Sequence, residues 1–186
     1  MKRISFILIL LLVSLGVMAQ QAEAGKTRAE RKAERKEERA KRDKEQTETT
    51  EKAIASGNYV LKADQLRDKY GRTLIANPDI NFVAKRGDEA IVQFGNDSGI
   101  GYNGVGGLTL RGRITNYSVT RGKKNGDYII VFTVTGTFGN ITVDVHSNIT
   151  GEYADARVES TWGNRLSFTG NIVPILNSRI FTGESY

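Results

Sequence analysis

Few side chains in this 186-residue sequence could do chemistry, and its single histidine, His146, is the natural starting point. A weak metal or acid–base site could be assembled from Asp144, His146 and Asp155, because Asp144 precedes His146 by two residues and Asp155 lies on the next expected strand. A surface ion pair with Arg157 explains the same residues. The sequence also lacks cysteine and any G-x-S-x-G elbow. We therefore assign no catalytic residue and no metal ligand.

The glycine-rich segment 99–104 matches G-x-G-x-x-G letter for letter. In dinucleotide-binding folds these glycines open a helix whose N-terminus holds a pyrophosphate. Here they lead into Leu108-Thr109-Leu110, which alternates like a strand. The pattern favours a tight turn or a flap at a ligand entrance, so we expect no cofactor.

A basic concentration and several aromatic residues supply the remaining candidates for binding. The cations are Arg111, Arg113, Arg121, Lys123 and Lys124, with Tyr117 and Tyr128 nearby. Trp162 and Phe181 are placed where they could line the mouth of a barrel. The candidate ligand-binding residues are Tyr102, Asn103, Arg111, Arg113 and Trp162. A solvated hairpin end and ordinary aromatic packing are the alternative explanations.

The charge and the N-terminus predict where the protein acts. Lys2 and Arg3 precede the uncharged apolar run 4–17, and small residues precede Gln20, as in a signal peptide cleaved after residue 19. This run is too short to span a bilayer, and no later segment would. The formal charge of +6 is spread evenly along the chain. We expect an exported, periplasmic or extracellular protein that does not bind nucleic acid.

Residues 20–58 differ in composition from the rest of the chain. Strong helix formers dominate, and opposite charges recur at helical spacing, as in Glu37 with Lys41 and Glu38 with Arg42. No apolar stripe exists that could build a coiled coil. This segment is predicted to be a charged helical spacer, with a disordered spacer and a partner-binding arm as alternatives.

Residues 59–186 carry the pattern of an all-β domain. All glycines except Gly16 and Gly25 lie beyond residue 56, and apolar residues alternate with period two. The alternation shifts phase between Ile114 and Tyr117, which predicts a bulge near Thr115-Asn116. Short connections allow only antiparallel neighbours. We expect an antiparallel meander of about eight strands, curled into a lipocalin-like barrel or half-barrel.

Several short segments resemble one secreted family. They include Ser56-Gly57-Asn58-Tyr59, Asn77-Pro78-Asp79, Arg86-Gly87-Asp88, Arg113-Ile114-Thr115-Asn116-Tyr117 and Phe168-Thr169-Gly170-Asn171-Ile172. Over residues 52–173 the chain is similar to the family catalogued as domain of unknown function 4251. The resemblance implies an exported β domain of Gram-negative bacteria, with no assigned activity and no catalytic residues to transfer.

These observations favour a non-enzymatic binding or scaffolding domain in the cell envelope, whose partner is an unidentified envelope component. One alternative is a carrier of a small apolar ligand. The other is a hydrolase or lyase acting on envelope glycans, which would require clustered carboxylates or His146 in a cleft. The predicted interior, from Leu110, Ile130, Phe132, Val143 and Phe168, forms either a packed core or a small apolar pocket.

Overall fold

A computed structural model describes residues 27–96 and 103–183 of the chain, so the expected leader lies outside the described residues. In this part of the chain one long helix precedes a β-sheet. The elements are α2 (Arg28–Ser56), β1 (Asn58–Asp68), β2 (Thr73–Ile75), β3 (Phe82–Arg86), β4 (Glu89–Phe94), β5 (Leu108–Arg121), β6 (Tyr128–Gly136), β7 (Gly139–Ser147), β8 (Ala154–Ser160), β9 (Arg165–Pro174) and the 3-10 helix η1 (Ile175–Asn177).

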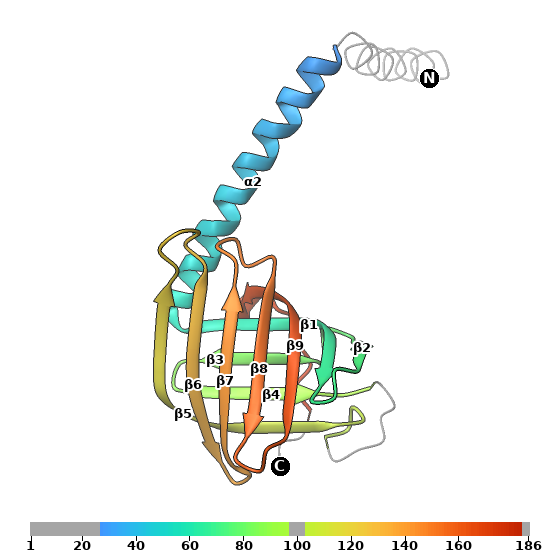
Figure 1. Ribbon diagram of the computed structural model, residues 1–186, viewed down its shortest axis with the longest axis vertical. Coiled ribbons are helices and arrows are strands. Elements are labelled where there is room, and N and C mark those ends of the chain that lie inside the picture. The colour runs from blue at the N-terminus through green and yellow to red at the C-terminus, as the bar shows by residue number, and fades with distance from the viewer. Residues whose placement is uncertain (1–26, 97–102, 184–186) are drawn as a thin grey trace, which may run out of the picture. The chain divides into compact units, whose positions relative to one another are not determined.

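The sheet closes into an antiparallel barrel of eight strands. Its order is β2-β1-β3-β4-β5-β6-β7-β8-β9, and an additional pairing of β1 with β9 closes the ring (Figure 1). One edge of β1 pairs with β3 and then with the short β2, which lies outside the ring. The predicted meander is therefore confirmed, as a closed barrel rather than a half-barrel. The extra strand β2 was not predicted, because its three exposed residues form no alternating pattern.

The bulge predicted in β5 is present. The register with β6 shifts between Thr115 and Ser118, and Asn116 has a φ of 54°. Ile114 lies opposite Val134 before the bulge, and Val119 lies opposite Ile130 after it. Both partners on β6 are buried, so the bulge keeps the apolar side chains of β5 on the interior face although their numbering changes phase.

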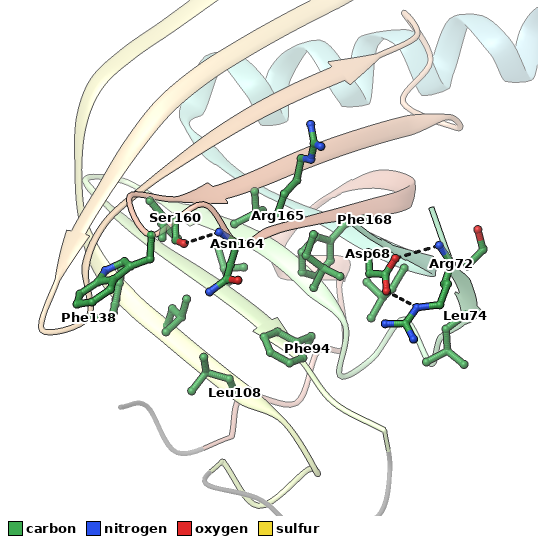
Figure 2. A pocket seen from close by; sticks show the side chains of 18 residues that line it. Asp68, Arg72, Leu74, Phe94, Leu108, Phe138, Ser160, Asn164, Arg165 and Phe168 are labelled. Atoms are coloured by element: carbon green, nitrogen blue, oxygen red, sulfur yellow. Dashed lines mark hydrogen bonds and ion pairs between the residues drawn. The ribbon is translucent and has the colours of Figure 1, made fainter. Parts of the chain in front are cut away.

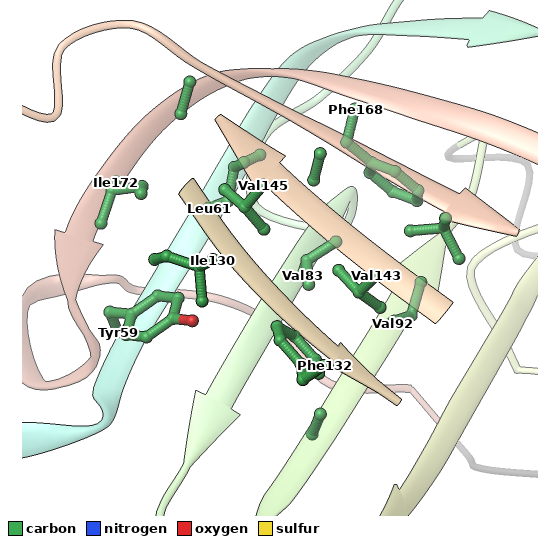
Figure 3. Packing of buried hydrophobic residues seen from close by; sticks show 14 of the residues in the cluster. Tyr59, Leu61, Val83, Val92, Ile130, Phe132, Val143, Val145, Phe168 and Ile172 are labelled. Carbon is green, nitrogen blue, oxygen red and sulfur yellow. The ribbon is translucent and has the colours of Figure 1, made fainter. Parts of the chain in front are cut away.

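Part of the barrel interior is a packed hydrophobic core (Figure 3). Its largest fully buried apolar side chains are Tyr59, Leu61, Ile130, Phe132 and Phe168. Burying a side chain of this size contributes roughly 1.5–3 kcal/mol. A smaller cluster on the outer face, built on Val60, Phe82 and Ala84, packs against Ile175 and Ile180 of the C-terminal segment. Both faces of this part of the sheet are therefore apolar.

The division of the chain into two compact units falls within α2, between residues 42 and 43. In the first unit, the helix begins with a capping box in which the backbone amide of Thr27 donates to Glu30 Oε2 (2.7 Å) and the amide of Glu30 donates to Thr27 Oγ1 (3.3 Å). Every described residue before residue 43 is exposed. No helix among the described residues is long and apolar enough to cross a membrane.

In the second unit, the last turns of α2 belong to the barrel. Ala53 and Ile54 join the hydrophobic core, and the Thr50 hydroxyl donates to the carbonyl of Thr150 (2.8 Å). Arg121 of β5 forms an ion pair with Glu51 (3.1 Å). The helix ends at Ser56 and is followed by Gly57, whose φ of 67° suits glycine. The predicted spacer is thus helical over the described range, and its end packs against the barrel.

Candidate functional site

The end of the barrel far from these helix turns is built from four connections between strands. They are the β1–β2 hairpin, the β4–β5 connection, the β6–β7 turn and the β8–β9 turn. Because neighbouring strands are antiparallel, every second connection of the ring lies at the same end. We call this end the open end.

The open end leads into a cavity of about 780 Å³. This volume is within the range of roughly 300–1,000 Å³ that is typical of small-molecule sites. Twelve of its eighteen lining residues are apolar: Leu66, Leu74, Val92, Phe94, Leu108, Leu110, Phe138, Ile141, Val158, Trp162, Leu166 and Phe168. Figure 2 shows that Phe94, Leu108 and Phe168 reach the cavity from three different strands, β4, β5 and β9.

The alternation within each strand explains why this lining is apolar. Phe94 and Val92 of β4 share the interior face, and they lie opposite Leu108 and Leu110 of β5. Phe168 is fully buried and lies where the cavity meets the packed core. The barrel therefore contains both a packed core and an apolar pocket, and the two share side chains such as Val92, Ile141 and Phe168. Ile130, Phe132 and Val143 pack together, whereas Leu110 lines the cavity.

Polar side chains of the cavity gather at its rim. Arg72 Nε donates to Asp68 Oδ2 (2.6 Å), while the backbone amides of Tyr70 and Arg72 donate to Asp68 Oδ1 (2.9 Å each). Burial by itself would raise the pKa of Asp68, but these hydrogen bonds from Arg72 and Tyr70 hold it below its usual value. The carboxylate is thus used to fix the shape of the hairpin. In the β8–β9 turn, the backbone amide of Asn164 donates to Ser160 Oγ (3.2 Å; Figure 2).

Of the four candidate ligand-binding residues that the structure describes, Trp162 lines the cavity, and Asn103, Arg111 and Arg113 do not. The Trp162 side chain lines the mouth and is 82% exposed. Tyr102 lies outside the described residues. Phe181 is exposed, but it is not among the residues that line the cavity. Its backbone instead ties the C-terminal segment to Asp79, whose carbonyl accepts from the Phe181 amide (2.9 Å).

Asn103 is buried and holds the chain where it enters β5. Its amide nitrogen donates to Thr109 Oγ1 (3.1 Å), and its amide oxygen accepts from the backbone of Val105 (3.2 Å) and Gly107 (2.9 Å). Thr109 in turn donates to Gln93 Oε1 (2.8 Å). The polar atoms of Asn103 are thus engaged within the protein, where they hold residues 103–107 at the start of β5.

Arg111 and Arg113 lie on the outer face of the barrel, away from the cavity. They alternate with Leu110, which faces inward, and lie opposite Ile91 and Glu89 of β4. Arg111 borders a small outer groove that also contains Ile91. The structure therefore does not bring these two arginines together with Trp162.

Asp144, His146 and Asp155 also lie on the outer face, on β7 and β8. His146 Nε2 is 3.2 Å from Asp144 Oδ1, and Asp155 Oδ2 accepts a hydrogen bond from the Thr169 hydroxyl (2.8 Å). Arg157 is directly opposite Asp144 in the register. Within residues 27–96 and 103–183, no group of three His, Cys, Asp or Glu side chains could hold a metal ion.

The contribution of the β1–β2 hairpin to the cavity was not predicted from the sequence. Asp68, Arg72 and Leu74 all line it. The signal that could have revealed the hairpin is Gly71, which has a φ of 84° and lies between two short runs that could pair. Phe138 of the β6–β7 turn also lines the cavity, although the sequence analysis did not single it out.

Fold and cavity together define a class: a closed antiparallel β-barrel with an apolar cavity at one end. The chain belongs to the family described as domain of unknown function (DUF4251), whose model matches residues 41–172. The resemblance found in the sequence is thereby confirmed.

Among solved structures, the chain is similar to the crystal structure of a DUF4251 family protein from Bacteroides eggerthii DSM 20697 at 1.95 Å resolution. The two are 23% identical, the match covers 76% of this chain and 95% of that one, and the TM-score is 0.61. At this identity the likeness concerns the fold. No curated protein matches the chain.

Proposed function

We propose that this protein binds a small apolar ligand in the cavity at its open end, and that it does so without catalysing a reaction. The observation that carries this proposal is the lining of the cavity: apolar side chains cover its walls, and polar groups occur at its rim. Preformed apolar pockets with few polar groups are typical of small-molecule sites. The leader expected at residues 1–19 would deliver this activity to the cell envelope.

The positions of the titratable groups favour binding over glycan hydrolysis. A hydrolase needs a carboxylate or a histidine within reach of the bound substrate. Among the described residues that line the cavity, Asp68 is the one carboxylate, and it is engaged by Arg72. Asp144 and His146 pair with each other on the outer face. These contacts support a role in which the cavity holds its ligand unchanged.

The uncharged fluorescent probe N-phenyl-1-naphthylamine tests this proposal directly. Its emission should rise on binding to the full chain, and L110E should weaken that binding by about tenfold or more, because a carboxylate would enter an apolar wall. L108E, nearer the rim, serves as a second variant if L110E folds poorly. The matched control is I129E, since Ile129 is an apolar residue of β6 on the outer face.

Retained melting temperature and circular dichroism would show that each variant is folded. The proposal predicts probe binding by the wild type and by I129E, and weak binding by both cavity variants. Equal affinity in all four proteins, or no binding by the folded wild type, would overturn it.

A further inference from the structure

Exposed apolar side chains surround the mouth of the cavity, where no part of the described chain covers them. Tyr70 is 75% exposed, Leu74 is 59% exposed and Trp162 is 82% exposed. Leu74 and Trp162 line the cavity from two different connections, the β1–β2 hairpin and the β8–β9 turn. Tyr70 occupies the tip of that hairpin, between Asp68 and Arg72. Exposed apolar side chains of the β1–β2 hairpin and of the β8–β9 turn therefore lie beside the apolar mouth of the cavity.

Cations alternate with these side chains. Residues 65–75, which form the hairpin, contain three cations, Arg67, Lys69 and Arg72, and a single carboxylate, Asp68. Lys69 Nζ is 5.4 Å and Arg72 Cζ is 5.6 Å from the centroid of the Tyr70 ring. Because Arg72 already neutralises Asp68, the hairpin presents an excess of positive charge beside an aromatic ring. Its chemistry suits a surface that is both apolar and anionic.

A lipid bilayer meets these requirements better than a folded protein partner. Tyrosine and tryptophan are enriched at the level of the lipid headgroups, and Lys and Arg beside them are attracted to anionic lipids. A stable protein interface needs a continuous complementary patch, whereas here the exposed apolar groups are single side chains on two separate connections. A fluid bilayer can accommodate the hairpin and the turn separately. Insertion of both would bring the mouth of the cavity against the acyl chains.

We propose that the open end docks onto an anionic lipid bilayer. Tyr70, Leu74 and Trp162 enter the headgroup region, and Lys69 and Arg72 contact the lipid phosphates. An apolar ligand then passes between the bilayer and the cavity without crossing water. This inference rests on the proposed ligand binding, because the docked mouth gives the ligand its path.

Trp162 makes the test direct, because it is the single tryptophan of the chain. The full chain is mixed with vesicles of phosphatidylcholine, with or without phosphatidylglycerol, in which the acyl chains carry bromine. Since the apolar run 4–17 could itself enter a bilayer, the measurement is the quenching of Trp162 emission rather than vesicle binding. We expect strong quenching of Trp162 emission with the anionic vesicles, and quenching about fivefold or more weaker with phosphatidylcholine alone.

The variant K69Q/Y70S removes a positive charge and an aromatic ring from the tip of the hairpin and leaves the cavity lining intact. It should reduce the quenching of Trp162 emission about threefold or more, while N-phenyl-1-naphthylamine binding is unchanged. The control is L176S, since Leu176 is 94% exposed and lies at the other end of the barrel, beside the last turns of α2. L110E should lose the probe and keep the quenching, which separates docking from a lipid chain inside the cavity. Absent quenching, or equal quenching in K69Q/Y70S and L176S, would overturn the docking and leave the ligand site standing.

Discussion

At the scale of single residues, the clearest electrostatic features are tyrosines and a lysine inside the barrel. Burial raises the pKa of Tyr59 well above its usual value, and the neighbouring Tyr117 adds to the rise. Burial lowers the pKa of Lys85, an effect that Asp88 opposes. Lys85 Nζ donates to the carbonyl of Gly87 (2.6 Å) and lies 4.4 Å from the centroid of the Tyr117 ring. Each group is thus held in its neutral form more readily than in water.

The raised pKa of Tyr59 predicts a loss of stability in alkali. Above about pH 10 an unfolded chain releases this proton while the folded chain keeps it, so the free energy of unfolding falls as the pH rises. Below that pH the contribution is fully present. We expect Y59F to remove this part of the loss, so that its urea midpoint falls less steeply than that of the wild type between about pH 10 and 11.5.

At neutral pH, Y59F should change the free energy of unfolding by less than about 1.5 kcal/mol. The exposed Tyr70 provides the control, as Y70F should follow the wild-type curve. Identical alkaline slopes for Y59F and the wild type would contradict the prediction.

At the scale of elements, closure of the barrel depends on how closely β1 and β9 approach. β1 contains a register irregularity between Ala63 and Gln65, and Gly170 of β9 pairs with Ala63 beside it. A Cβ atom at Gly170 would overlap the carbonyl oxygen of Lys62 and crowd Ala63 Cα. Glycine is required here by a close backbone contact, because Gly170 has no positive φ.

G170A should therefore weaken closure directly. We expect the free energy of unfolding to fall by about 1–3 kcal/mol, measured by urea denaturation, because the added methyl group must push the two strands apart. Hydrogen exchange should speed up most in the β1–β9 ladder.

The comparison variant is G122A. A Cβ atom there would lie 3.6 Å from its nearest neighbour, which is an ordinary contact. Its free energy of unfolding should stay within about 0.5 kcal/mol of the wild type. Equal effects of the two substitutions would show that the close approach at Gly170 does not limit closure.

At the scale of the whole molecule, α2 contains two stretches with different roles. Its described residues before residue 43 are all exposed and belong to the first compact unit. Thr50, Ala53 and Ile54 are buried and belong with the barrel. The first part of this helix is thus exposed to solvent, and side chains of its last turns pack in the hydrophobic core.

Deleting residues 28–42 should leave the stability of the barrel almost unchanged. We expect the melting temperature to shift by less than about 2 °C, because no side chain in this range is buried. By contrast, I54A should lower the free energy of unfolding by about 2–5 kcal/mol, since it opens a cavity in the core. Calorimetry on both proteins checks the contrast, and a large shift on deletion would contradict it.

Much of the architecture could be predicted from local patterns. The period-two alternation of residues such as Ile130, Phe132 and Val134 placed the strands and their inner faces, and a phase change revealed the bulge in β5. The cavity could not be predicted in the same way. Leu110 and Ile130 show the same alternation, yet one lines the cavity and the other is packed in the core.

By itself, the sequence determined the meander, the bulge and the family, because each is carried by residues close together along the chain. It left the charged segment open between a helix and a disordered spacer. Only the tertiary structure decided which end of the barrel is filled and which is open. That outcome depends on contacts between distant segments: β1 with β9, Ile54 with the core, and Leu74 with the cavity. The period-two pattern shows which face of a strand is apolar. It does not show whether the side chains of that face pack against other segments or line a cavity.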